Sequence, residues 1–197
     1  MKRITFPFLF LVLAIACCQG LQGQDFSPSK GCFKATATLT PGYVLSQGGA
    51  RAHVHGFAEY FLNEKISLSG DVFFHAVQLP VSANWIHREA HGLFLGGYYH
   101  WTHRGHDIYV GFQSGLQTGF ADFLKEPADP RLLPPAPAVS LVLGYTYYFN
   151  RWFHFFTQPR FTYARLANNL VRDVSDFRFS AGLGFHISSL TKRKEST

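Results

Sequence analysis

Charge is scarce in this chain of 197 residues, and cysteine and long apolar runs are scarce as well. Asp, Glu, Lys and Arg make up 15% of the residues, whereas roughly 25% is usual for a soluble domain. This low charge, together with 17% aromatic residues, argues against disorder and against a cytosolic protein with an ordinary charged surface. The basic residues behind the net charge of +6 are scattered, and no zinc-ligand spacing occurs, so we expect no nucleic-acid partner.

Beyond the N-terminus, no stretch approaches the roughly 18 consecutive apolar residues of a transmembrane helix. The start of the chain is different, because the basic residues Lys2 and Arg3 precede an apolar segment from Phe6 to Ala16. This order is typical of a secretory signal peptide, and we expect residues 1–23 to be cleaved off. The residues before Cys17 loosely resemble a lipobox, so lipidation there is the alternative. After ordinary cleavage Cys32 would be the one cysteine left, which excludes an intrachain disulfide.

The rest of the chain alternates apolar with polar or small residues. In 139–149, for example, Val139, Leu141 and Leu143 lie on one face of a strand, and Ser140 and Thr146 lie on the other. Runs of about ten residues with this pattern are typical of transmembrane β-strands. We count eight of them, at 33–43, 50–62, 65–76, 91–101, 106–120, 139–149, 152–164 and 177–187. The sequence therefore predicts an all-β protein, an eight-stranded antiparallel up-and-down transmembrane barrel.

The connections between these segments alternate in length. Minimal turns are expected at 63–64, 104–105 and 150–151, whereas 77–90, 121–138 and 166–176 are long. The first connection, around 47–49, is also short. Short turns at one end and mostly long loops at the other match the periplasmic and extracellular ends of an outer-membrane barrel. The prolines of 127–137 indicate a stiff surface excursion and not a further strand. We expect a periplasmic segment at 24–32, the barrel at 33–188 and a basic periplasmic tail at 189–197.

A soluble lipid-binding barrel is the main structural rival, but its outer face would carry more charge than either face of these strands does. The polar face consists largely of Gly, Ser, Thr, Gln, Tyr and His, which suits a narrow hydrogen-bonded interior. Buried charges must be paired, so we expect its few ions to pair across strands in a structural polar network. These ions are Lys34, Arg51, Glu59, Lys65, Asp71, Asp107, Arg160 and Arg178.

The chain resembles the small outer-membrane β-barrels of the OmpA/OmpX type, and more closely the compact outer-membrane barrels common in Bacteroidota. The resemblance covers residues 33–188 and is carried by the leader, the strand pattern and the glycine-aromatic spacing of 93–99 and 181–185. It implies an outer-membrane location in a Gram-negative bacterium, with membrane lipids including lipopolysaccharide and the barrel-assembly machinery as partners. Many such barrels end on an aromatic residue, whereas this chain continues past Phe185 to Lys192-Arg193-Lys194.

The ten histidines raise the question of a metal site. The short turn at 63–65 would put His53 across from His75, with His55 on the same face. Three imidazoles on one face could hold Zn or Cu. Hydrogen-bonded interior histidines are the alternative, and because no fourth ligand is evident we expect no cofactor.

An enzyme is the other alternative, because some eight-stranded outer-membrane barrels are lipid A deacylases with a His-x-Ser pair near the end of the chain. His186 and Ser188 match only that spacing, at the expected periplasmic end and away from lipid A. We therefore expect a non-enzymatic barrel with a structural or surface-interaction role through its long loops and an extracellular partner of unknown identity. Its lipid-interface aromatics should be Tyr43, Tyr60, Trp101, Tyr145, Phe149 and Tyr163.

Overall fold

The computed structural model describes residues 26–45, 49–78, 87–121, 131–132, 135–164 and 175–188. Among these residues, no helix is long and apolar enough to cross a membrane. The expected leader (1–23) and basic tail (189–197) lie outside the described residues, as do most of the three long connections.

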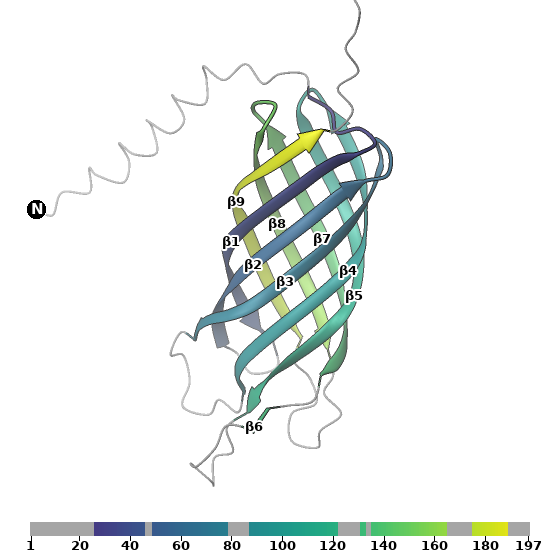
Figure 1. Ribbon diagram of the computed structural model, residues 1–197. Coiled ribbons are helices and arrows are strands. Elements are labelled where there is room, and N and C mark those ends of the chain that lie inside the picture. The colour runs from purple at the N-terminus through teal and green to yellow at the C-terminus, as the bar shows by residue number, and fades with distance from the viewer. Residues whose placement is uncertain are drawn as a thin grey trace, which may run out of the picture.

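Eight antiparallel strands close into a barrel (Figure 1). They are β1 (Cys32–Val44), β2 (Gly49–Phe61), β3 (Ile66–Gln78), β4 (His87–His103), β5 (His106–Ala121), β7 (Ala136–Tyr148), β8 (Phe153–Ala164) and β9 (Asp176–Ser188). Each strand pairs with the next, and β9 pairs with β1. Closure leaves no unpaired sheet edge, and it confirms the eight-stranded up-and-down barrel expected from the sequence.

The strands are staggered around the barrel. Pairings followed once around from Phe33 in β1 return to β1 at Tyr43, ten residues along the strand, which is why the strands in Figure 1 are steeply tilted. The residues crossed are Phe33, Tyr60, Leu68, Gly97, Phe112, Leu141, Phe161, Phe177 and Tyr43. Apart from Gly97, all of them are exposed aliphatic or aromatic side chains, so a continuous apolar band encircles the wall.

Three tight turns lie at one end of the barrel, which we call the turn end. Asn63 and Asn150 each accept hydrogen bonds at Oδ1 from the backbone N–H groups two and three residues later, at 2.7–2.9 Å. The third turn has positive φ at both Arg104 (47°) and Gly105 (79°), as a two-residue hairpin requires. The long connections leave from the opposite end, the loop end (Figure 1). The connection between β1 and β2 is also at the loop end and is short, as expected from the sequence.

The proline-rich segment differs from expectation in two ways. β7 begins at Ala136 and includes Pro137, which opposes Leu116 of β5 at the start of the strand, where proline is tolerated. A two-residue strand, β6 (Arg131–Leu132), also pairs with the end of β5 inside the connection that was expected to contain no strand. β4 likewise starts at His87, four residues earlier than its alternation indicated.

Glycines make room for large rings inside the barrel. Tyr109 of β5 opposes Gly144 of β7, and Tyr98 of β4 opposes Gly111 of β5. In each pair the ring occupies the place that the Cβ of any larger residue would take. The two tyrosine rings stack with their centroids 5.1 Å apart, so the absence of a side chain on one strand permits a packed core in so narrow a barrel.

We expect Gly144→Ala to lower the free energy of unfolding by about 1–3 kcal/mol, because its methyl group would displace the Tyr109 ring from a packed interior. Gly56→Ala is the matched control, since its added Cβ would have the Val72 methyl as nearest neighbour at 3.4 Å, an ordinary contact. Urea titration of both variants refolded into lipid vesicles measures the difference. Equal destabilisation of the two would contradict this account of the core.

Candidate functional site: a buried ionic interior

Strand alternation points seven of the eight expected interior ions into the barrel. Their side chains are at most 2% exposed, and they are Lys34, Arg51, Glu59, Asp71, Asp107, Arg160 and Arg178. The eighth assignment, Lys65, was wrong. Lys65 is exposed, because it lies in the turn before β3, where strand alternation no longer applies.

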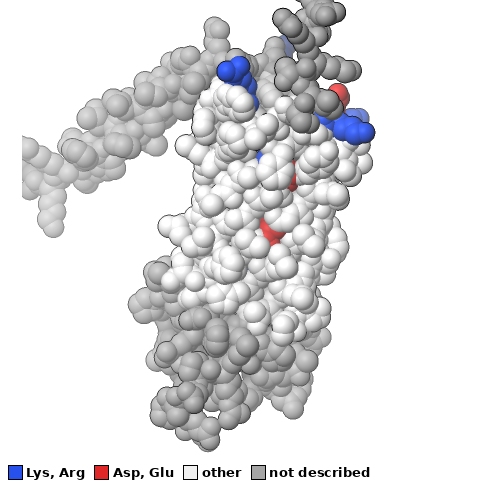
Figure 2. Space-filling view, in the orientation of Figure 1, with Lys and Arg blue, Asp and Glu red and all other residues white. Residues whose placement is uncertain are grey.

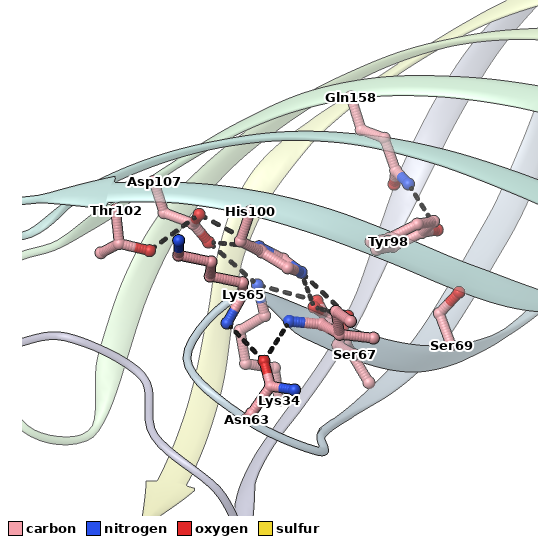
Figure 3. Close-up of polar contacts among 12 residues, drawn as sticks. Lys34, Asn63, Lys65, Ser67, Ser69, Tyr98, His100, Thr102, Asp107 and Gln158 are labelled. Atoms are coloured by element: carbon pink, nitrogen blue, oxygen red, sulfur yellow. Dashed lines mark hydrogen bonds and ion pairs between the residues drawn. The ribbon is translucent and has the colours of Figure 1, made fainter.

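Nearest the turn end lies the His100 cluster, defined by Lys34, Glu59, Ser67, His100 and Asp107 (Figure 3). Lys34 Nζ lies 2.8 Å from Glu59 Oε2 and 3.8 Å from Asp107 Oδ2. The imidazole of His100 lies between the same two carboxylates, with Nε2 2.9 Å from Glu59 Oε1 and Nδ1 3.0 Å from Asp107 Oδ2. The Ser67 hydroxyl donates to Glu59 Oε1 at 2.6 Å. Two carboxylates are thus shared between a lysine and a histidine.

The charges of the His100 cluster balance when the ring of His100 is a cation. An ionised carboxylate only accepts hydrogen bonds, so a ring with a carboxylate at each nitrogen donates from both. Lys34 and His100 then neutralise Glu59 and Asp107. Lys34 Nζ also lies 5.1–5.8 Å from the ring centroids of three aromatic residues, Phe61, Tyr109 and Tyr148. These rings shield the ammonium group from water while their faces attract it.

A second group, the Asp71 cluster, fills the middle of the barrel and contains His55, Asp71, Tyr98, Gln113 and Arg160. Asp71 Oδ1 accepts hydrogen bonds from Arg160 Nη2 at 2.5 Å and from His55 Nε2 at 2.8 Å. Asp71 Oδ2 accepts from Gln113 and, at 3.3 Å, from the Tyr98 hydroxyl. Arg160 Nη1 donates to Gln113 Oε1 at 2.6 Å. One carboxylate therefore joins side chains from five strands.

Toward the loop end, the Arg178 guanidinium donates to Asp176 Oδ2 from Nε at 2.9 Å and from Nη2 at 2.6 Å. Its other neighbour is the Phe73 ring, whose centroid lies 4.4 Å from Arg178 Cζ. Arg51 is also buried at this level. The observed pairs Lys34–Glu59 and Asp71–Arg160 were among those expected, whereas Asp176 was not anticipated as the partner of Arg178.

The three histidines considered for a metal do not form a common site. The register does put His53 opposite His75, with ring centroids 6.0 Å apart. His55, however, uses Nε2 for Asp71 and has Nδ1 3.0 Å from the Ser180 hydroxyl. No group of three His, Cys, Asp or Glu side chains that could hold a metal ion occurs within the described ranges.

His186 lies in the interior near the turn end, surrounded by rings. Its Nδ1 is 3.3 Å from Nδ1 of His154, and its ring centroid is 4.5 Å from that of Phe26 and 5.0 Å from that of Tyr148. Ser188 opposes Cys32 at the end of β9. Another imidazole occupies the position at His186 Nδ1 where a hydrolase triad would have an orienting acid.

The expected interface aromatics lie at two levels of the outer wall. Tyr43 and Tyr163 are exposed near the loop end, and Tyr60 and Trp101 near the turn end. Two more residues lie near the turn end and are half-buried, Tyr145 in β7 and Phe149 just after it. The Tyr145 hydroxyl is 2.7 Å from His106 Nδ1.

Sequence reasoning missed the role of three polar residues, His100, Gln113 and Asp176. His100 and Gln113 occupy inward positions of alternating segments, and this is the signal that could have found them. Their partners come from other strands, as in the bond from Gln113 of β5 to Asp71 of β3. Asp176 was expected in a loop, whereas it begins β9 and bonds to Arg178 of the same strand. Pairing of this kind depends on the stagger around the whole barrel, which a single segment does not reveal.

No family model and no curated relative matches the chain. Solved structures do match it, at low sequence identity. Neisserial surface protein A matches with a TM-score of 0.63 at 13% identity, over 78% of this chain and 95% of that one. OprG from Pseudomonas aeruginosa matches with 0.58 at 14% identity, over 85% and 99%. Ail from Yersinia pestis matches with 0.55 at 10% identity, over 80% and 99%. The chain therefore has the fold of the small outer-membrane β-barrels.

We expect Lys34→Met to lower the free energy of unfolding by about 3–5 kcal/mol, because it leaves two buried carboxylates with His100 as their one remaining cation. Adding Glu59→Gln to Lys34→Met removes one of those carboxylates and should restore part of the loss. Urea titration in vesicles compares the single and double variants. A Lys34→Met barrel as stable as the parent would show that this cluster is not a paired network.

Proposed function

We propose that this chain is an integral outer-membrane β-barrel whose interior is closed by side chains and whose loop end presents a surface for interaction. The observation that carries the proposal is the distribution of polarity across the wall. Side chains such as Leu39, Leu95 and Leu183 are 61–67% exposed on the outside, whereas the charged side chains inside are buried. A wall that is apolar outside and ionic inside suits hydrocarbon around it, because the closed barrel pairs its own backbone groups.

This distribution is the reverse of what a soluble lipid-binding barrel needs. Such a barrel would keep its apolar side chains inside and place charges on its outer wall. The view in Figure 2 shows a mostly uncharged wall with blue and red side chains near the turn end. The outward apolar band therefore supports the membrane barrel over the soluble alternative.

The ionic interior supports a structural role over conduction or catalysis. Eight strands enclose just enough room for side chains, and Arg160, Tyr98 and Phe94 are among the large residues that fill it. Charges held by close partners are fixed in place and shielded, so they stabilise an interior that is closed by side chains. A lipid A deacylase remains the alternative for His186 and Ser188, but His154 and the surrounding rings support a packing role for His186.

The surface role is assigned to the connections 77–90, 121–138 and 166–176, most of which lie outside the described residues. Long loops on a rigid scaffold are where binding residues concentrate. Ail has been crystallised in complex with the heparin analogue sucrose octasulfate, so a barrel of this fold can bind such a ligand. By analogy, an extracellular partner at the loop end fits this chain, together with the surrounding lipids and lipopolysaccharide.

A charge at the middle of the outer wall should be costly if lipid surrounds it. We expect Leu141→Arg and Leu183→Arg each to lower the free energy of unfolding in vesicles by about 2–4 kcal/mol. Ile187→Arg is the matched control, because Ile187 also faces outward but lies near the turn end, where the cost should be about 0–1 kcal/mol. Equal stability of all three variants and the parent would remove the basis for a membrane location.

Trypsin treatment of intact cells tests which end of the barrel faces outward. Cleavage should occur after Lys125 in the long connection before β7, because loops are the preferred sites of proteolysis. Arg104 and Arg151, in the tight turns, should be cut only after the outer membrane is permeabilised. Fragments are identified by mass spectrometry, and cleavage at Arg104 in intact cells would reverse the assigned orientation.

A further inference from the structure

The exposed charges that the structure describes gather at the turn end of the barrel. Among residues whose exposure the structure describes, four cations and one carboxylate are exposed: Lys30, Lys65, Arg104, Arg151 and Glu64. All five lie in the tight turns or in the segment before β1, and Figure 2 shows blue side chains at this end above a wall that is white apart from small red areas. We call the four cations the basic collar. In the orientation proposed above, the basic collar faces the inner leaflet of the outer membrane.

Lys65 of the basic collar lines a cavity of about 530 Å³. The cavity lies beside the turn between β2 and β3, and its volume is within the range of small-ligand sites. The residues that line it include Ser27, Glu64, Lys65, Tyr99, Trp101 and His103. The Lys65 cation, the Glu64 carboxylate and hydroxyl groups thus lie beside aromatic side chains at the level where a lipid headgroup would lie.

The backbone of Lys65 is held in place at this cavity. Its N–H donates to Asn63 Oδ1 at 2.8 Å, and its carbonyl accepts from the N–H of His100 in β4 at 2.8 Å (Figure 3). The cation therefore starts from a fixed point next to β4, the strand that carries Tyr99 and Trp101. The exposed side chain of Lys65 is thus anchored beside the cavity through its backbone.

The wall of the cavity suits the glycerol and acyl part of a lipid. Tyr99 and Trp101 are 39% and 54% exposed on the outer face, with ring centroids 4.9 Å apart in an edge-to-face arrangement. Rings of this kind favour the headgroup level of a membrane, with the apolar part toward hydrocarbon. Ile108, 51% exposed, extends the wall along β5.

We propose that this cavity binds an anionic glycerophospholipid of the inner leaflet, with its phosphate at Lys65 and His103 and its glycerol against Trp101. The carboxylate of Glu64 at the rim accepts a hydrogen bond from a hydroxylated headgroup such as that of phosphatidylglycerol. Charge complementarity at the turn end favours the anionic class. Among residues whose exposure the structure describes, this end carries the four cations of the basic collar, of which Lys65 lines the cavity, and one exposed carboxylate, Glu64. The inference rests on the membrane location proposed above.

Fluorescence quenching at Trp101 tests the site directly. Trp85→Phe and Trp152→Phe leave Trp101 as the one tryptophan, and the protein is refolded into vesicles that contain brominated phosphatidylglycerol or brominated phosphatidylcholine. We expect the phosphatidylglycerol to bind beside Trp101 several-fold more strongly than the phosphatidylcholine. Equal quenching by the two lipids would overturn the proposal.

Two further variants distinguish lipid binding in the cavity from a general electrostatic attraction by the basic collar. Lys65→Gln should reduce the preference for phosphatidylglycerol about fivefold, the effect of one cation near a membrane surface. Arg151→Gln removes the same charge from the basic collar but lies outside the cavity, so the preference should stay within about twofold of the parent value. If both variants lost the preference for phosphatidylglycerol equally, the basic collar would attract the lipid only through its total charge. That result would overturn the proposed binding site.

Heat-modifiability on a gel, run on the same vesicles, separates this inference from the proposed function. A band that does not shift on boiling would show that the chain has not folded into the membrane, and both proposals would fail. A shifted band without a preference for phosphatidylglycerol would overturn the lipid site alone.

Discussion

Pairing of buried charge is the constraint on which this barrel depends. Its interior has no room for bulk water, so every ion inside must find its partner among side chains. In the His100 cluster, Lys34 and His100 share the carboxylates of Glu59 and Asp107 at 2.8–3.8 Å. In the Asp71 cluster, one carboxylate receives Arg160 and His55. These partners come from different strands, so the ionic contacts also fix the stagger of the wall.

The apolar outer wall is the counterpart of the polar interior. Because polar side chains take the inward positions, each strand presents its apolar residues outward, and the ten-residue stagger joins them into a continuous band. Exposed charge then remains only where strands end, among residues whose exposure the structure describes. The tight turns collect these cations at the turn end, whereas the long connections leave from the loop end.

Packing inside the barrel depends on pairing a large side chain with a small one on the neighbouring strand. A barrel of eight strands is too narrow for two large side chains to face each other at every level. Tyr109 opposite Gly144 and Tyr98 opposite Gly111 solve this by pairing a ring with a glycine. The stacked tyrosines separate the His100 cluster from the Asp71 cluster, and Tyr98 also bonds to Asp71. Aromatic packing and ion pairing are thus parts of one interior, and neither could be altered without disturbing the other.

The sequence by itself determined the eight strands of the barrel, their antiparallel order and the side on which residues within those strands lie, because a period of two is a local property that survives without tertiary context. It also predicted that Lys34 and Glu59 would be inside, and the length of the turn put His53 opposite His75. Only the tertiary structure decided which ions meet. The contact of Gln113 with Asp71, or of Arg178 with the Phe73 ring, depends on stagger and closure summed over several strands. Local alternation also failed at Lys65, because a side chain beyond the last paired residue is no longer held to either face of the sheet.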